Sequence, residues 1–224
     1  MDSTKKRSTI AGLLLLVIFI TGVYIFQFLQ GAVLFSENFA IQTAENENKI
    51  ILSVLLAVFS GIASIIVSIL LHPIFKKQHY NLAYLYVAFS ILNFIAIMVD
   101  NYSVISILEF SKEYIKSGSL TSNSIQMMKT ITFQKHWWTH YFYLLISCFP
   151  VFVLYYTLFV SKLIPRILSI FGIFAVLIMS IQVLASIYGN SISMNMMLPM
   201  AIIQIILPFW FIFKGLKTIE EATP

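Results

Sequence analysis

The sequence predicts an all-α protein, a single transmembrane helical bundle of six spans with both termini in the cytoplasm. Of the 224 residues, 59% are hydrophobic and only 10% are charged, whereas soluble domains carry about 25% charged residues. A soluble core of this length could not enclose so much apolar surface, but lipid removes the need to do so. The apolar residues also gather in six runs, each close to the ~20 residues that cross a bilayer.

The first two runs cover residues 9–29 and 50–71. The first follows a basic tail, as a signal peptide would, but it exceeds the apolar length of about 7–15 residues found in such peptides. No small-x-small cleavage site follows it, so we expect a retained span. The second run ends at His72-Pro73, because proline interrupts a helix. Its small residues recur every three or four positions, which predicts close packing against a neighbouring helix.

The third run, residues 82–100, leads into a long polar connection. We expect its helix to extend as far as Lys116 and to break at Gly118. Residues 121–134 then form either an amphipathic helix lying on the membrane or a plain loop. The amphipathic alternative depends on four residues at helical intervals: Ile125, Met128, Ile131 and Thr132.

The last three spans are expected at residues 137–160, 167–188 and 196–213. Trp137 and Trp138 open the fourth span, as is typical of the membrane interface. The fifth begins after Pro165-Arg166. The sixth contains two prolines, which can kink a membrane helix and free its backbone carbonyls.

Loop charges predict the orientation. Nine Lys and Arg residues fall in the termini and the two short loops on one side, against five on the other side. Because basic residues stay in the cytoplasm, the side with nine is expected to be cytoplasmic. The net charge of +5 is therefore explained by topology, and we expect no nucleic-acid partner.

Polar side chains within the spans are the candidates for function, since each costs free energy in lipid unless it is paired. With the predicted orientation, the candidates named below lie between mid-membrane and the non-cytoplasmic side, where they could line one pocket or form separate interhelical hydrogen bonds. Asp100 is either a hydrated helix-end carboxylate or a buried acid that binds a cation or a ligand amine. The ligand-binding candidates are Asn93, Asp100, His136, His140, Tyr143, Gln182 and Gln204.

His136 and His140 lie one helical turn apart, a spacing that can ligate zinc. Such a site needs a third protein ligand, which Asp100 or Glu109 could supply only if the third and fourth spans meet at their non-cytoplasmic ends. Interfacial histidines are the commoner outcome of this spacing. We therefore expect no cofactor, with the two histidines as the metal-ligand candidates.

Four short segments resemble one family. These are Ile10–Leu14 after the basic tail, His136 at the start of the fourth span, Leu-Ile-Pro-Arg-Ile-Leu at 163–168, and Phe-Ile-Phe-Lys-Gly-Leu at 211–216. Together they make the chain similar to the bacterial membrane family called domain of unknown function 4386, over nearly its whole length. The resemblance implies six spans in a bacterial inner membrane, and it implies no activity.

Three functions stay open at this stage. We favour a non-enzymatic membrane protein that contacts membrane lipids and binds a small lipophilic or lipid ligand in a pocket open to the non-cytoplasmic side. An intramembrane enzyme using Asp100 with His136 or His140 is the second hypothesis. A structural or assembly subunit, packing through the small residues of the second span, is the third. No span has a charge at its centre, which argues against a proton- or sodium-driven transporter, and the oligomeric state is left undetermined.

Overall fold

The computed structural model describes residues 3–36, 38–118, 123–190 and 193–217. Within these ranges the chain is helical and contains no strand. Six of its helices are long and apolar enough to cross a membrane, which confirms the predicted six-span, all-α class. The candidate spans are Thr4–Leu34, Glu47–Gln78, Tyr80–Lys116, Asn123–Val160, Arg166–Ile187 and Asn195–Phe213.

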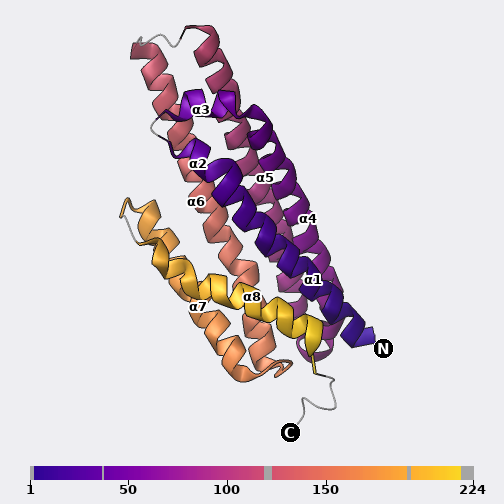
Figure 1. Cartoon of the computed structure of the whole chain (residues 1–224). Coiled ribbons are helices and arrows are strands. Elements are labelled where there is room, and N and C mark those ends of the chain that lie inside the picture. The colour runs from indigo at the N-terminus through magenta and orange to yellow at the C-terminus, as the bar shows by residue number, and fades with distance from the viewer. Residues whose placement is uncertain (1–2, 37, 119–122, 191–192, 218–224) are drawn as a thin grey trace.

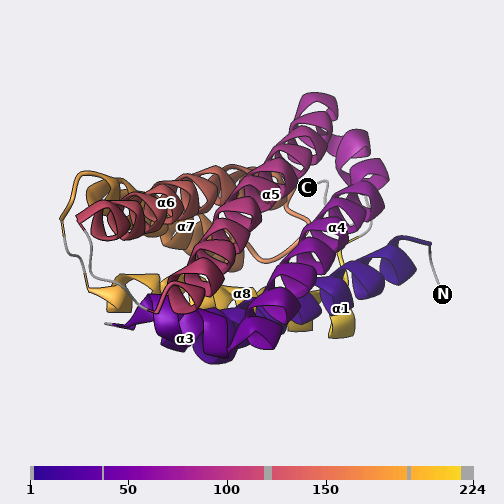
Figure 2. The same ribbon diagram turned by 90° about the horizontal axis from the view of Figure 1, so that it is seen from above.

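The six spans form a closed ring. α1 (Ser3–Tyr24) packs against α4 (Glu47–Gln78), which packs against α5 (Tyr80–Lys116). The order continues through α6 (Asn123–Val160) and α7 (Arg166–Ile187) to α8 (Leu198–Phe213), which returns to α1 (Figure 2). Neighbours in sequence are therefore neighbours in space, as short connections between helices require.

Both ends of the described chain lie at the same end of the bundle (Figure 1). The Ser8 hydroxyl donates to the Phe211 carbonyl at 3.3 Å, joining the start of α1 to the end of α8. The Lys217 amide donates to the Leu163 carbonyl at 3.0 Å, which brings the α6–α7 turn to the same place. We call this the basic end, because the four basic segments of the sequence meet there, and the opposite end the distal end.

α5 and α6 are longer than a bilayer needs. They contain 37 and 38 residues, so each is about 55 Å long against a hydrocarbon core of about 30 Å. Both protrude at the distal end, where Gly118, with φ +74°, lies just beyond the end of α5. The predicted extension of the third helix to Lys116 is confirmed.

Two local predictions were wrong. Residues 123–134 are neither a separate surface helix nor a loop but the first turns of α6, while residues 121 and 122 lie outside the described ranges. Phe133 packs against the distal apolar cluster described below, while Met127, Met128 and Ile131 are more than half exposed, and the helix continues through the segment without a break. α4 also passes through Pro73 and ends at Gln78, because Ile74 and Phe75 are buried in the bundle core and hold the next turn in place.

The distal end of the bundle carries a second core. α2 (Gly31–Leu34) and α3 (Phe39–Glu45) fold across the protruding part of α5 (Figure 1). We call residues 31–36, 38–50, 101–116 and 123–136 the distal cap. Its apolar interior is separate from the core of the bundle and is formed by Val33, Leu34, Phe39, Ala40, Ile50, Val104, Ile107 and Leu108.

A π-helical segment, Ile25–Gln30, joins α1 to α2. A wider turn of this kind changes the direction in which the following side chains point. Gln30 Nε2 donates to the Ser53 hydroxyl of α4 at 2.9 Å. Gly31 is needed directly after it, because a Cβ there would collide with the Phe26 carbonyl.

Candidate metal centre

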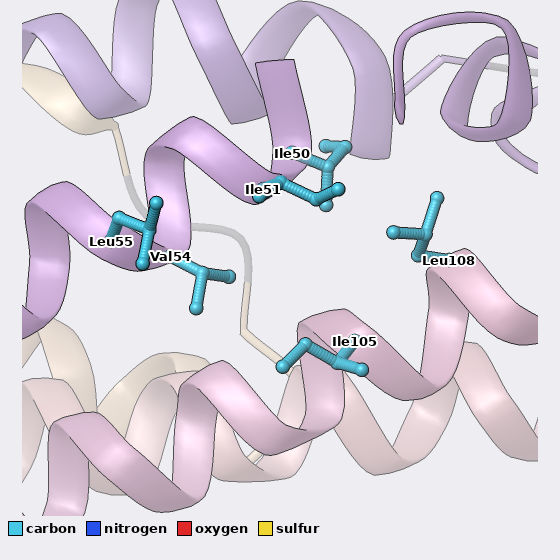
Figure 3. A pocket seen from close by; sticks show the side chains of 6 residues that line it. All are labelled: Ile50, Ile51, Val54, Leu55, Ile105 and Leu108. Atoms are coloured by element: carbon cyan, nitrogen blue, oxygen red, sulfur yellow. The ribbon is translucent and has the colours of Figure 1, made fainter. Parts of the chain in front are cut away.

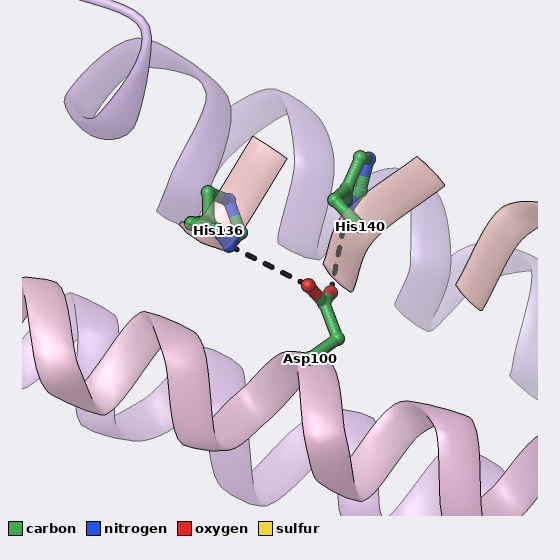
Figure 4. Close-up of side chains that lie close together, drawn as sticks. All are labelled: Asp100, His136 and His140. Carbon is green, nitrogen blue, oxygen red and sulfur yellow. Dashed lines mark hydrogen bonds and ion pairs between the residues drawn. The ribbon is translucent and has the colours of Figure 1, made fainter. Parts of the chain in front are cut away.

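Asp100 of α5 lies between His136 and His140 of α6 (Figure 4). One carboxylate oxygen, Oδ1, lies 3.5 Å from His136 Nδ1, and the other, Oδ2, lies 3.3 Å from His140 Nδ1. The two histidines present the same face of α6 because four residues make about one helical turn. The antiparallel packing of α5 and α6 thus brings together the candidates that the sequence left on separate spans.

The cluster lies where the membrane meets the distal cap. About 30 Å of helix separates Tyr80, at the basic end of α5, from Asp100, which matches the thickness of the hydrocarbon core. The Asp100 and His136 side chains are only 10% and 3% exposed, while His140 is 22% exposed. A carboxylate this deeply buried is expensive unless a cation or several donors compensate its charge.

Two hydroxyl groups complete the surroundings of the carboxylate. Thr139 Oγ1 lies 3.2 Å from Asp100 Oδ1 and 2.7 Å from the Ser103 hydroxyl. Ser103 Oγ donates to the Asp100 backbone carbonyl at 2.7 Å and lies 2.9 Å from His136 Nδ1. Ser103 and Thr139 therefore fix the orientation of Asp100 and His136.

The presence of Ser103, His136 and Asp100 does not make a nucleophilic triad. In that arrangement the serine and the carboxylate hydrogen-bond to opposite nitrogens of the imidazole, so that the carboxylate orients the base. Here both Ser103 Oγ and Asp100 Oδ1 face the same nitrogen, Nδ1. Asp100 therefore does not hold the second imidazole nitrogen, Nε2, as a triad would require, and His136 is not oriented as a general base for Ser103.

The geometry fits a small divalent cation. The three ligand atoms, one from each side chain, lie within 4.8 Å of one another. Metal–ligand bonds of 2.0–2.1 Å in a tetrahedral site place neighbouring ligand atoms about 3.3–3.4 Å apart. The carboxylate-to-imidazole separations of 3.3 and 3.5 Å, measured to the two different oxygens of Asp100, are close to this spacing. Ligand atoms that lie up to 4.8 Å apart would have to draw together around the ion.

The other predicted site residues are arranged less closely. The Tyr143 ring contacts the His140 ring, with centroids 6.1 Å apart, and so borders the cluster. Asn93 is buried on α5 about two turns toward the basic end, and its Oδ1 has no hydrogen-bond partner within the described part of the chain. Gln182 is buried on α7, and its Oε1 has no hydrogen-bond partner among the described residues, while Gln204 is half-buried on α8. That all seven predicted residues line a single pocket stays a prediction.

Sequence reasoning missed Ser103 and Thr139, although both lie at helical spacing from predicted residues. Ser103 follows Asp100 by three positions and Thr139 follows His136 by three, which was the available signal. Glu109, the alternative third ligand, pairs with Lys112 at 3.4 Å instead. Glu109 lies in the protruding part of α5, more than two helical turns beyond Asp100, and is therefore not grouped with His136 and His140.

Comparison with known families agrees with the resemblance drawn from the sequence. The model of the family described as Domain of unknown function (DUF4386) matches residues 10–215. The chain belongs to this family. No curated protein and no solved structure matches it. The description of DUF4386 leaves the function of the family open.

Proposed function

We propose that this DUF4386 protein binds a divalent transition-metal ion through Asp100, His136 and His140. The supporting observation is the convergence of one carboxylate and two imidazoles from neighbouring helices, with one ligand atom of each within 4.8 Å of the others. Nitrogen and carboxylate ligands in this number suit Zn²⁺ and its neighbours in the transition series. Burial of the carboxylate favours an occupied site, since the ion compensates the buried charge.

The membrane setting belongs to the same proposal. The chain crosses a bacterial inner membrane six times, with the basic end in the cytoplasm and the distal cap on the opposite side. The positive-inside rule supports this orientation, because the four basic segments meet at one end of the bundle. The metal centre then lies at the non-cytoplasmic boundary of the bilayer.

Metal content is the decisive measurement. Protein purified in detergent without chelator is expected to carry a stoichiometric transition metal by plasma mass spectrometry, and Asp100→Asn and His140→Ala are expected to lose it. His79→Ala is the matched control, because His79 is an exposed histidine in the α4–α5 turn. Gel filtration confirms that each variant is folded. Metal-free wild-type protein that takes up no zinc or cobalt would refute the proposal.

The number of protein ligands distinguishes an open metal site from a closed structural one. Zinc sites with three protein ligands keep a fourth position for water or substrate, whereas structural sites use four. Cobalt-loaded protein is expected to show the visible bands of a tetrahedral ion, and azide is expected to shift them by replacing the fourth ligand. Bands that do not respond to azide would indicate a closed structural site and would remove metal-dependent catalysis as the second candidate function.

A further inference from the structure

An apolar groove lies between the distal parts of α4 and α5, on a different face of α5 from the metal centre. Its volume is about 210 Å³, and all of its lining side chains are aliphatic. Figure 3 shows the two helices contributing to opposite walls. The lining residues are Ile50, Ile51, Val54, Leu55, Ile105 and Leu108.

The groove lies at the membrane boundary. Asn101 Nδ2, one residue beyond Asp100, donates to the backbone carbonyl of Val54 at 3.3 Å, so the inner end of the groove is level with the metal centre. Leu108 lies about two helical turns farther toward the distal end. The groove therefore extends from the end of the hydrocarbon core into the headgroup layer.

One side of the groove is open to the surroundings of the bundle. Ile51, Leu55 and Ile105 are 43%, 61% and 41% exposed. Leaving such side chains in water is unfavourable by about 25 cal/mol per Å² of apolar surface. An apolar chain that continues from the adjacent lipid would cover them without crossing a polar region.

The distal end of the groove carries balanced charges. Lys112, one turn beyond Leu108, forms ion pairs with Glu47 and Glu109. Lys49 adds a second positive charge at the start of α4. Two basic and two acidic side chains suit a headgroup that carries both signs better than an anionic one.

We propose that this groove binds one acyl chain of a zwitterionic phospholipid, with the headgroup among Glu47, Lys49, Glu109 and Lys112. The lipid comes from the leaflet at the distal end, which is the outer leaflet in the proposed orientation. Its ammonium group pairs with a glutamate and its phosphate with a lysine. This binding does not depend on the metal centre, so Asp100→Asn leaves it unchanged.

Photo-crosslinking tests the proposal on the full chain in phosphatidylethanolamine nanodiscs, with a diazirine carried on the acyl chain. Mass spectrometry is expected to find adducts concentrated on residues 50–55 and 105–108, several-fold above the lipid-facing surface of α7. Ile105→Trp fills the groove and is expected to remove the excess. Ile95→Trp, at an isoleucine of α5 that is 53% exposed and lies outside the groove, is the matched control. It is expected to leave the labelling unchanged.

Four outcomes would overturn the proposal. Adducts spread evenly over all lipid-facing helices would show ordinary annular lipid, as would labelling that survives Ile105→Trp. Equal labelling by a phosphatidylglycerol probe of the same acyl length would show that the groove has no preference for a zwitterionic headgroup. A dimer in native mass spectrometry that dissociates on Ile105→Trp would show that a second copy of the chain occupies the groove.

Discussion

Zinc should stabilise the metal-free protein by an amount set by the zinc concentration relative to the Kd of the three-ligand site. A ligand that binds only the folded state adds about 2.7 kcal/mol to stability at a concentration 100 times its Kd. For a chain of 224 residues, each kcal/mol raises Tm by about 2–4 °C. Zinc added at 100 times its Kd is therefore expected to raise Tm by about 5–11 °C. Tryptophan fluorescence on heating is a suitable assay, because Trp137 adjoins His136.

Variants make this prediction quantitative. If Asp100→Asn weakens binding 100-fold, the same zinc concentration equals the new Kd and stabilises by only about 0.4 kcal/mol, a Tm rise of about 1–2 °C. Ser103→Ala removes a group that orients a ligand, a change that typically weakens metal binding 10- to 100-fold. Its Tm rise with zinc should therefore lie between those of wild type and Asp100→Asn. Equal shifts in wild type and Asp100→Asn would place zinc elsewhere and refute the reasoning. An unchanged wild-type Tm at saturating zinc would do the same.

Three further predictions test packing, topology and the cap. Gly172→Ala should destabilise by about 1–3 kcal/mol through overpacking, because its Cβ would collide with the buried Tyr155 ring, whereas Gly22→Ala, with open space around it, should be neutral in thermal unfolding. In a Cys148→Ala background, an impermeant maleimide added to intact cells should label Lys116→Cys and spare Lys162→Cys, and the reverse pattern would invert the proposed orientation. Gln30→Leu should lower the unfolding free energy by about 1 kcal/mol or less through loss of the Ser53 hydrogen bond, and a loss as large as that of Gly172→Ala would mean that the π-helical turn organises the whole cap.

The spans could be predicted from the sequence because lipid imposes a simple requirement of length and apolarity. Each predicted span lies within one of the six candidate spans of the structure, apart from residue 188, one position beyond the end of α7. The protrusion of α5 and α6 was harder to predict. Residues 123–134 are mixed in character, and their helicity depends on contacts such as the one between Phe133 and Phe39, whose ring centroids are 5.2 Å apart. A sequence pattern cannot supply a partner from a segment about ninety residues away.

The candidate site was predictable in composition but not in register. The sequence placed Asp100 on one helix and His136 and His140 on another, and the i, i+4 spacing made the histidines share a face. Whether Asp100 meets them depends on how far α5 and α6 slide past each other. A shift of two residues along one helix would turn its side chains by about 200° and carry the carboxylate to the far side. The packing of the cap helps to set this register, and it does not follow from local spacing.

Register and burial together suggest how an ion would reach the centre. The Asp100 and His136 side chains are only 10% and 3% exposed, whereas the His140 side chain is 22% exposed. An incoming ion therefore meets His140 first and displaces water there before it reaches the carboxylate. His140→Ala should accordingly slow zinc uptake as well as weaken binding, while Ser103→Ala, behind the ligands, should mainly accelerate zinc release. Stopped-flow measurement with a zinc indicator separates the two rates, and a similar loss of the uptake rate in both variants would contradict this route.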